Sequence, residues 1–284
     1  LPRSGPRSGE EHDSMRYAPP RRLLFALLAV GLAGVLAATA TPPTSATADL
    51  VQENTTLAFV TYDGEVAIED LTVRARGEAP GSGELTYVLI DGGGATVALS
   101  GGTGPDGRFE RDVPLEGEDR ALAPGTIEGF VVTPGRDGVY GTGDQAPESS
   151  GDLVTFVGDL GREGLTQPQA VQRLLQATVQ APGSDDGMLR QSFALTNART
   201  EVTDIVPEGT NETGIRPIAV GETMVVQGVT NRRPDQNSIL LEISRGGSAV
   251  DLQTPIVEDW NTSGVWTAKV SVPDTSQPGN YTLR

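Results

Sequence analysis

The sequence predicts an all-β protein with two β-sandwich domains. Three observations support this: short alternating apolar runs, glycine-rich turns between them, and few aromatic residues. Of the 284 residues, 37% are hydrophobic and 5% aromatic, and 36 are Gly and 20 are Pro. A disordered chain would share the Gly, Pro and charge content, but it has no reason to keep clean alternation. The composition therefore favours small β cores over one large core.

The first sandwich is expected over residues 49–160, where apolar and polar residues alternate at the period of a strand. Residues 71–76 and 85–90 each place three apolar side chains on one face. Stretches at 91–94 and 105–107 offer the glycines that tight hairpin turns require. We expect further strands at 96–99, 108–113, 126–132 and 153–157.

One helix is expected at residues 166–180, within a connecting segment that we place at 161–187. Its apolar face consists of Val171, Leu174, Leu175 and Val179. We favour a helix that covers a sheet edge or a gap in the core over one that only bridges the sandwiches. The polar residues 184–187 then form a linker.

The second sandwich is expected over residues 188–284. Apolar residues alternate with polar ones at 239–243 and 266–272, and Trp266 is expected in the core and not as a ligand platform. The sequence ends inside a strand expected at 281–284, so we expect this domain to be truncated at its C-terminus.

Residues 1–48 are expected to hold an upstream extension and a signal peptide. An uncharged stretch at 23–40 follows a basic region, and small residues then permit cleavage between Ala48 and Asp49. An uncleaved N-terminal anchor is the alternative, because this stretch is nearly long enough to span a bilayer. A translation start at Met15 would give a leader of ordinary length.

The expected mature chain is strongly acidic. Removing the leader's five Arg and three acidic residues from the 21 basic and 38 acidic residues leaves 16 against 35, or about −19. Such a surface suits molar salt and repels nucleic acid, although an acidic protein from a GC-rich genome is the alternative. We expect the fold to loosen below roughly 0.5 M salt, where screening weakens.

The side chains of the mature chain argue against catalysis. There is no Cys, His12 precedes the leader, and the single Lys269 falls on the expected solvent face of a strand. Nucleophilic triads and zinc sites need those residues. Paired carboxylates remain, but in so acidic a chain they form a solvated face. We therefore predict no enzyme, no catalytic residue and no required cofactor.

Calcium is the inorganic ligand that the sequence favours most. Asp137 and Asp144 flank a glycine-rich loop, and carboxylate and carbonyl oxygens are the ligands that Ca²⁺ prefers. A β-hairpin turn capped by Asp is the alternative that we favour.

Four asparagines stand in sequons that permit N-glycosylation of an exported chain. Asn54 and Asn211 have polar, turn-prone surroundings that suggest exposure, and Asn280 stands where the last strand is expected to begin. The four candidates are Asn54, Asn211, Asn261 and Asn280.

Two sets of short motifs stand out: residues 220–232, 257–260, 264–266 and 277–282 form the first, and residues 71–77, 85–92 and 135–139 form the second. The first set resembles a recurring module of haloarchaeal surface-layer glycoproteins, and the second resembles an upstream module of the same proteins. The resemblance implies immunoglobulin-like domains, N-glycans, calcium-assisted lattice assembly and a location outside the cell membrane.

Together these observations predict a structural cell-surface glycoprotein module related to an S-layer cell wall. Its expected partners are further copies or other surface glycoproteins, N-glycans and divalent cations, but not nucleic acid. Membrane contact would come only through the leader or a missing C-terminal anchor. The alternative is a secreted or surface-attached adhesion or ligand-binding protein on the same scaffold.

Overall fold

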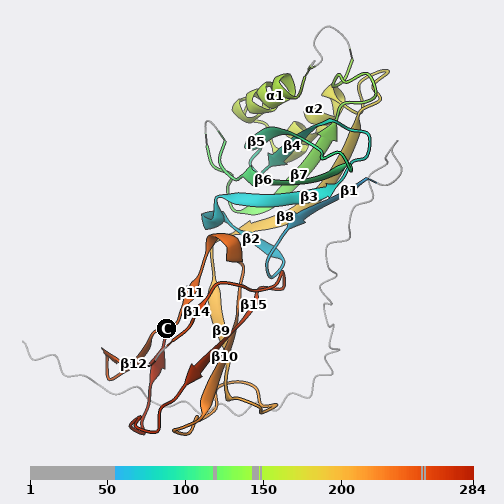
Figure 1. The fold of residues 1–284 in the computed structure, drawn as a ribbon. Helices are drawn as coiled ribbons and strands as arrows, with labels where there is room; N and C mark the ends of the chain where they lie inside the picture. Colours follow the sequence, from blue (N-terminus) through green and yellow to red (C-terminus); the bar gives the residue numbers. More distant parts are fainter. Residues whose placement is uncertain (1–54, 118–119, 143–146, 148, 251, 253) are drawn as a thin grey trace, which may run out of the picture. The chain divides into compact units, whose positions relative to one another are not determined.

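The computed structural model describes residues 55–284, apart from residues 118–119, 143–146, 148, 251 and 253. β-strands dominate the regular structure, with two α-helices and two short 3-10 helices among the described residues (Figure 1). The prediction of a mostly β protein is confirmed. Ala48 and Asp49, the expected cleavage site, lie outside the described residues.

Two sheets pack face to face in the N-terminal part, which we define as residues 55–199. The small sheet has the order β1-β3-β6, with β1 at Thr56–Val60, β3 at Thr72–Glu78 and β6 at Arg108–Pro114. The large sheet has the order β2-β8-β7-β4-β5, with β2 at Glu65–Ala67, β8 at Gly187–Thr196, β7 at Gly125–Thr133, β4 at Glu84–Ile90 and β5 at Thr96–Gly102. The strands predicted at 85–90, 96–99, 108–113 and 126–132 are confirmed.

The facing surfaces of the two sheets form an apolar core. Phe59 packs on Phe193 with 5.3 Å between ring centroids, and Tyr87 meets Phe109 edge-on at 5.9 Å. At the free edge of β1, the backbone N–H of Phe59 donates to Oε1 of Gln191 at 2.8 Å. A side chain therefore occupies an edge that would otherwise be open to strand pairing.

Two helices cover the opposite face of the large sheet: α1 at Ser150–Arg162 and α2 at Gln167–Ala177 (Figure 1). Val88 and Ile90 of β4 pack with apolar residues of these helices, while Leu85, Tyr87 and Leu89 face the core between the sheets. The N-terminal part therefore has three layers, with β4 buried on both faces.

The prediction of a strand at 153–157 is wrong, because these residues lie in α1. Leu153, Val157 and Leu160 recur at helical spacing and are buried against the sheet. Ser149 caps the helix, since its side chain accepts a hydrogen bond from the N–H of Asp152 at 3.2 Å. A short apolar run does not distinguish a strand from one face of a helix.

The helix predicted at 166–180 is confirmed as α2. Its first turn is fixed by Gln169, whose Oε1 accepts a hydrogen bond from the N–H of Thr166 at 2.9 Å. Val171 and Leu174 are buried against the large sheet. The helix thus covers a face of the large sheet, and not the sheet edge or core gap that we favoured.

The predicted boundary before residue 188 falls at the start of β8. This strand pairs antiparallel with β7 from Gly187 to Leu195 and parallel with β2, so it completes the large sheet. The residues expected to form a linker, 184–187, include a buried carboxylate, Asp186. Apolar cross-strand pairs such as Val131 with Leu189 account for this placement.

The C-terminal part, residues 200–284, consists of three small antiparallel sheets. The largest has the order β15-β10-β9, with β15 at Val265–Ser271, β10 at Thr223–Thr230 and β9 at Thr200–Pro207. The others are β11 (Ile239–Leu240) with β14 (Ile256–Val257), and the order β13-β12-β16 with β13 at Ser248–Ala249, β12 at Ile243–Arg245 and β16 at Thr282–Leu283. The strand predicted over 239–243 is thus divided into β11 and β12.

Trp266 lies at the centre of the C-terminal core and is 1% exposed, which confirms its prediction as a core residue. Gly228 on β10 leaves room for the indole, because a Cβ there would lie 2.3 Å from Cζ2 of Trp266. Lys269 lies on β15 with Trp266, is exposed and forms an ion pair with Glu208, as expected for the solvent face.

Leu71 is the exception to the alternation predicted at 71–76. It follows the 3-10 helix η1 (Ile68–Asp70), has a φ of 61° and is 68% exposed, while β3 begins at Thr72. The side chains that β3 buries are Val73 and Ala75. Leu71 therefore turns the chain and does not contribute to the core.

Candidate functional site

A polar cluster around three buried side chains, Asp70, Asn231 and Arg233, connects the N-terminal and C-terminal parts, and we refer to it as the buried polar cluster. Its members come from four segments that are far apart in the sequence. The buried polar cluster consists of Asp63, Glu65, Asp70, Thr72, Arg74, Asp112, Thr196, Arg199, Asn231, Arg232, Arg233, Asp235 and Asn237.

Asp70 lies at one centre of this cluster, and its side chain is fully buried. Its carboxylate accepts hydrogen bonds from Nε of Arg232 at 3.1 Å, from the N–H of Arg233 at 2.9 Å and from Nδ2 of Asn237 at 2.9 Å. All three donors belong to the loop after β10. Since an unpaired buried charge is costly, these donors hold Asp70 and the loop in one arrangement.

Arg233 is the second centre and is 3% exposed. Its guanidinium binds Asp235 through two hydrogen bonds of 3.0 and 2.7 Å, donates to Oγ1 of Thr72 at 2.9 Å and forms an ion pair with Asp112 at 3.1 Å. Arg74 also pairs with both of these carboxylates. The planar guanidinium suits such forked contacts, and Lys would not reproduce them.

The arginines alter the acidity of the carboxylates that they contact. Burial opposes ionisation of Asp112, yet hydrogen bonds from Arg74 and Arg233 hold the pKa of its carboxyl below the ordinary value. The hydrogen bond from Arg233 likewise lowers the pKa of Asp235. Both groups are therefore stabilised in the charged form that the ion pairs require.

Asn231 is the third centre and is fully buried. Its Nδ2 donates to Oγ1 of Thr196 and to the carbonyl oxygen of Asn197, both at 2.9 Å, and its Oδ1 accepts from the N–H of Arg199 at 2.8 Å. The Arg199 guanidinium in turn contacts Asp63 and Glu65. One amide thus ties the end of β8 to the loop after β10.

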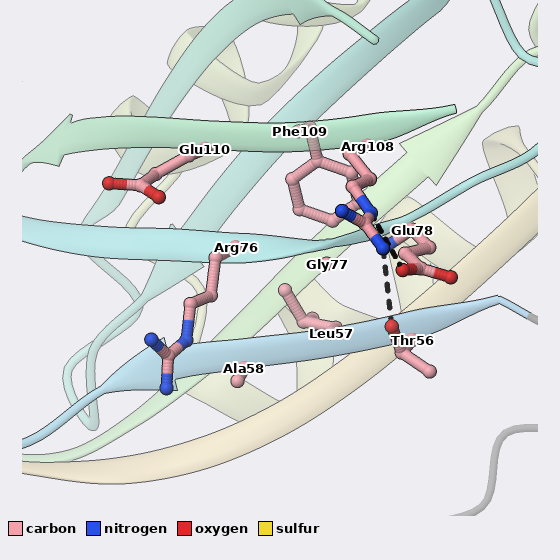
Figure 2. A pocket seen from close by; sticks show the side chains of 9 residues that line it. All are labelled: Thr56, Leu57, Ala58, Arg76, Gly77, Glu78, Arg108, Phe109 and Glu110. Atoms are coloured by element: carbon pink, nitrogen blue, oxygen red, sulfur yellow. Dashed lines mark hydrogen bonds and ion pairs between the residues drawn. The ribbon is translucent and has the colours of Figure 1, made fainter. Parts of the chain in front are cut away.

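A shallow hollow of about 450 Å³ lies on the outer face of the small sheet, across β1, β3 and β6 (Figure 2). Charged residues of opposite sign stand opposite each other on β3 and β6: Arg76 faces Glu110, and Glu78 faces Arg108. Nε of Arg108 and Oε1 of Glu78 are 3.0 Å apart. These pairs neutralise opposite charges across neighbouring strands. They do not place a nucleophile beside a base, as covalent catalysis requires.

Gly77 lies on the floor of this hollow and is required by close backbone packing. A Cβ at this position would lie 1.9 Å from the carbonyl oxygen of Thr56 and 2.7 Å from Cζ of Phe109 (Figure 2). Glycine at this position therefore lets β1 and the ring of Phe109 approach β3 closely.

The structure describes three of the four predicted glycosylation residues. Asn211, Asn261 and Asn280 are exposed, whereas Asn54 lies outside the described residues. Oδ1 of Asn261 accepts hydrogen bonds from the N–H and the hydroxyl of Ser263, at 3.1 and 2.5 Å. Their exposure is compatible with modification, and occupancy stays a prediction.

Of the predicted calcium ligands, Asp137 is exposed and Asp144 lies outside the described residues. Oδ1 of Asp137 accepts a hydrogen bond from the N–H of Val139 at 3.0 Å, which is the turn-capping contact of the alternative that we favour. Among residues 55–284, gaps excepted, no three His, Cys, Asp or Glu side chains are grouped to hold a metal ion. Calcium binding stays a prediction.

The sequence analysis missed the residue that organises this loop. Asp186 is buried and accepts hydrogen bonds from the N–H groups of Gly135 and Gly141, at 3.2 and 2.6 Å. Burial raises the pKa of Asp186 and these hydrogen bonds lower it, with a net increase. The sequence places two consecutive aspartates, Asp185 and Asp186, directly before β8. Their polarity led us to predict a linker there and not a buried carboxylate.

The fold and the buried polar cluster define a class of protein: a mostly β module in which charged side chains fix segments distant in sequence. Within the described part of the chain, neither helix is long and apolar enough to cross a membrane. No protein-family model matches the sequence.

The chain is a relative of haloarchaeal cell surface glycoproteins. It is 29% identical over 229 residues to the cell surface glycoprotein of Halobacterium salinarum, covering 80% of this chain and 25% of that protein. The cell surface glycoproteins of Haloarcula marismortui and Haloarcula japonica are 30% and 28% identical over 210 and 209 residues, each match covering 73% of this chain and 22% of the relative.

These relatives confirm the predicted resemblance and support a location at the cell surface. The chain spans about a quarter of the length of the curated relatives that it matches.

Two solved structures are similar over most of the chain, but at low scores. A tetra-tandem repeat from the extending region of a large adhesion protein is 10% identical, with a TM-score of 0.28, over 81% of this chain and 44% of the other. A 1.5-MDa bacterial ice-binding adhesin is 14% identical, with a TM-score of 0.23, over 78% and 56%.

Proposed function

We propose that this chain is a structural module of a surface-layer glycoprotein and that it contributes to an S-layer cell wall. The observation that carries the proposal is the similarity to three haloarchaeal cell surface glycoproteins over 73–80% of the chain. We further propose that its two β parts act as consecutive immunoglobulin-like sandwiches, the first with an added helical layer. The relatives support no enzymatic class.

The buried polar cluster supports a mechanical role for the module. A wall component must transmit force without bending at its junctions, and directional ion pairs favour one arrangement of two parts over others. The Asp70 side chain is 0% exposed, so its ion pair with Arg232 is screened less by salt than a surface pair. We expect this part of the junction to persist in brine that weakens surface electrostatics.

Fractionation of cells that produce the full-length protein tests this function. A wall component should be abundant, should sediment with cell envelopes and should leave them when divalent cations are chelated. A control wash with the same ionic strength and no chelator should leave it in place. A scarce protein that stays in the envelope after chelation and binds a specific ligand would favour the adhesion alternative.

We propose N-glycans at the exposed sequons Asn211, Asn261 and Asn280, and also at Asn54. Glycopeptide mass spectrometry of protein from a haloarchaeal host should find modified asparagine at these positions. Unmodified peptides at all of them would refute the assignment.

Calcium binding at Asp137 and Asp144 is proposed as an aid to assembly. In a calcium titration, Tm should rise for the wild-type chain and less for D137A and D144A. If Ca²⁺ leaves the Tm of the wild type unchanged, the site does not exist.

We also propose export through a leader cleaved between Ala48 and Asp49. N-terminal sequencing of surface material should find Asp49 first, whereas a retained leader would indicate the anchor alternative.

A further inference from the structure

An apolar hollow lies in the C-terminal part, between the loop that follows β9 and the loop that precedes β16. Its volume is about 530 Å³. Most of the side chains that line it are aliphatic. They include Ile205, Ile215, Ile218, Val220, Met224 and Leu283. We refer to it as the end hollow.

The end hollow exposes large apolar side chains to solvent. Ile215 is 76% exposed, Val220 is 45% exposed and Tyr281 is 38% exposed. Apolar area left in water is unfavourable, and contiguous exposed patches commonly mark a surface that something covers. Molar salt increases this cost, because excluded salts strengthen apolar association.

A glycosylation sequon lies in the lining of the end hollow itself. Asn280 is exposed and lines the hollow, and Thr282 completes the sequon. Among the described residues, no hydrogen bond engages the Asn280 side chain, whereas Asn261 accepts two from Ser263. The amide of Asn280 is therefore available at the mouth of an apolar surface.

The loop that carries Asn280 is held in place by Arg245. Its guanidinium lies 5.7 Å from the centre of the Tyr281 ring and donates to Oε1 of Gln277 at 2.5 Å and to the carbonyl oxygen of Pro278 at 3.0 Å. The Tyr281 hydroxyl donates to the carbonyl oxygen of Gln277. A platform fixed in this way loses little conformational entropy when a ligand covers it.

We infer that the first sugars of an N-glycan on Asn280 lie over the end hollow and cover Ile215, Val220 and Tyr281. The C–H face of a pyranose packs on aliphatic and aromatic side chains, while its hydroxyl groups remain hydrated. Covalent attachment at the rim supplies a high effective concentration, so a weak contact suffices. This inference rests on the glycosylation proposed above.

The modification needs a lipid-phosphate-linked oligosaccharide and an oligosaccharyltransferase. Nδ2 of Asn280 forms a bond to C1 of the first sugar, the C1–O bond to the phosphate carrier breaks, and the amide loses one proton to the medium as the phosphate leaves. The end hollow takes no part in this step. It receives the sugar afterwards.

Two substitutions at one exposed position test the inference. T282V removes the sequon and T282S retains it, and both leave Asn280 in place. The full chain from a haloarchaeal host is analysed by glycopeptide mass spectrometry and by fluorescence of the apolar dye bis-ANS in molar salt. We expect T282V to lose the Asn280 glycan and to gain dye fluorescence severalfold, and T282S to resemble the wild type.

Two further variants locate the signal. N261Q should lose its own glycan without a rise in dye fluorescence. I215S combined with T282V should show a smaller rise in dye fluorescence than T282V alone, because the double variant lacks an apolar side chain of the end hollow. General unfolding of the double variant would instead raise the dye fluorescence further.

Each result decides between the two proposals. A T282V protein that loses the glycan with unchanged dye fluorescence overturns the covering role and leaves glycosylation intact. An unmodified Asn280 beside modified Asn211 and Asn261 overturns the inference alone, and no modification at any sequon overturns the glycosylation proposal as well. If T282V binds little dye and forms a dimer at higher protein concentration, a second copy of the chain covers the end hollow. That result also overturns the inference.

Discussion

The helical layer and the buried polar cluster both join segments that are distant in sequence, but they do so with opposite chemistry. α1 and α2 contact the large sheet through aliphatic side chains such as Leu153 and Leu174, which attract without direction. The cluster joins its segments through forked hydrogen bonds around Asp70 and Arg233. Apolar contacts tolerate changes of similar volume, whereas a buried charge tolerates few changes of partner.

The largest effect should come from removing the central carboxylate of the cluster. D70A leaves the donors of Arg232, Arg233 and Asn237 unsatisfied in a buried site, and we expect a loss of about 3–5 kcal/mol in the free energy of unfolding. Urea denaturation in molar salt measures it. As a control, E242Q alters an exposed carboxylate outside the cluster and should change stability by less than about 0.5 kcal/mol. A loss for D70A no larger than for E242Q would show that the cluster is not structural.

The helical layer should tolerate a substitution of similar volume better than the buried polar cluster does. L174A removes a buried side chain from α2 and is expected to cost about 2–4 kcal/mol, while L174M should cost less than about 1.5 kcal/mol. The same denaturation experiment compares them. If L174A and L174M lose equal free energy of unfolding, this interface tolerates substitution no better than the buried polar cluster does.

Acid should loosen the cluster before the helical layer. The folded chain holds the pKa of Asp112, Asp235 and Glu65 below their ordinary values of 3.8, 3.8 and 4.5. Groups of this kind contribute stability above the unfolded pKa and lose it as pH falls through the lowered folded pKa. Stability should therefore decline below about pH 4.5, and the decline should be shallower in D112N. A D112N profile parallel to that of the wild type would contradict the linkage.

The smallest effect concerns the turn that leads into the cluster. Leu71 has a φ of 61° and is 68% exposed, so L71G removes backbone strain and little packing. We expect a gain of about 0.5–1 kcal/mol, reduced by the greater freedom of glycine in the unfolded chain. L71A keeps the Cβ and should give no gain. Stabilisation by both variants would point to the exposed isobutyl group and not to the backbone.

The strands and the second helix could be predicted from the sequence, whereas the first helix could not. Period-two alternation in β4 predicted a strand with one buried face. The structure buries both faces, because the helices cover the side on which Val88 lies. Residues 153–157 were too short and too uniformly apolar to distinguish a strand from a helix.

No local pattern in the sequence predicts the buried polar cluster. Asp70 and Arg232 are 162 positions apart, and in an acidic chain a single aspartate or an arginine pair resembles any solvated charge. The predicted sequons were readable as motifs, but the apolar surroundings of Asn280 depend on loops that meet only in the folded chain.

The capped edge of β1 has a consequence for contacts between molecules. Gln191 already takes the hydrogen bond that Phe59 would offer to a neighbouring strand. A strand of another molecule that pairs with β1 would have to displace this contact first, which makes sheet extension at this edge unfavourable.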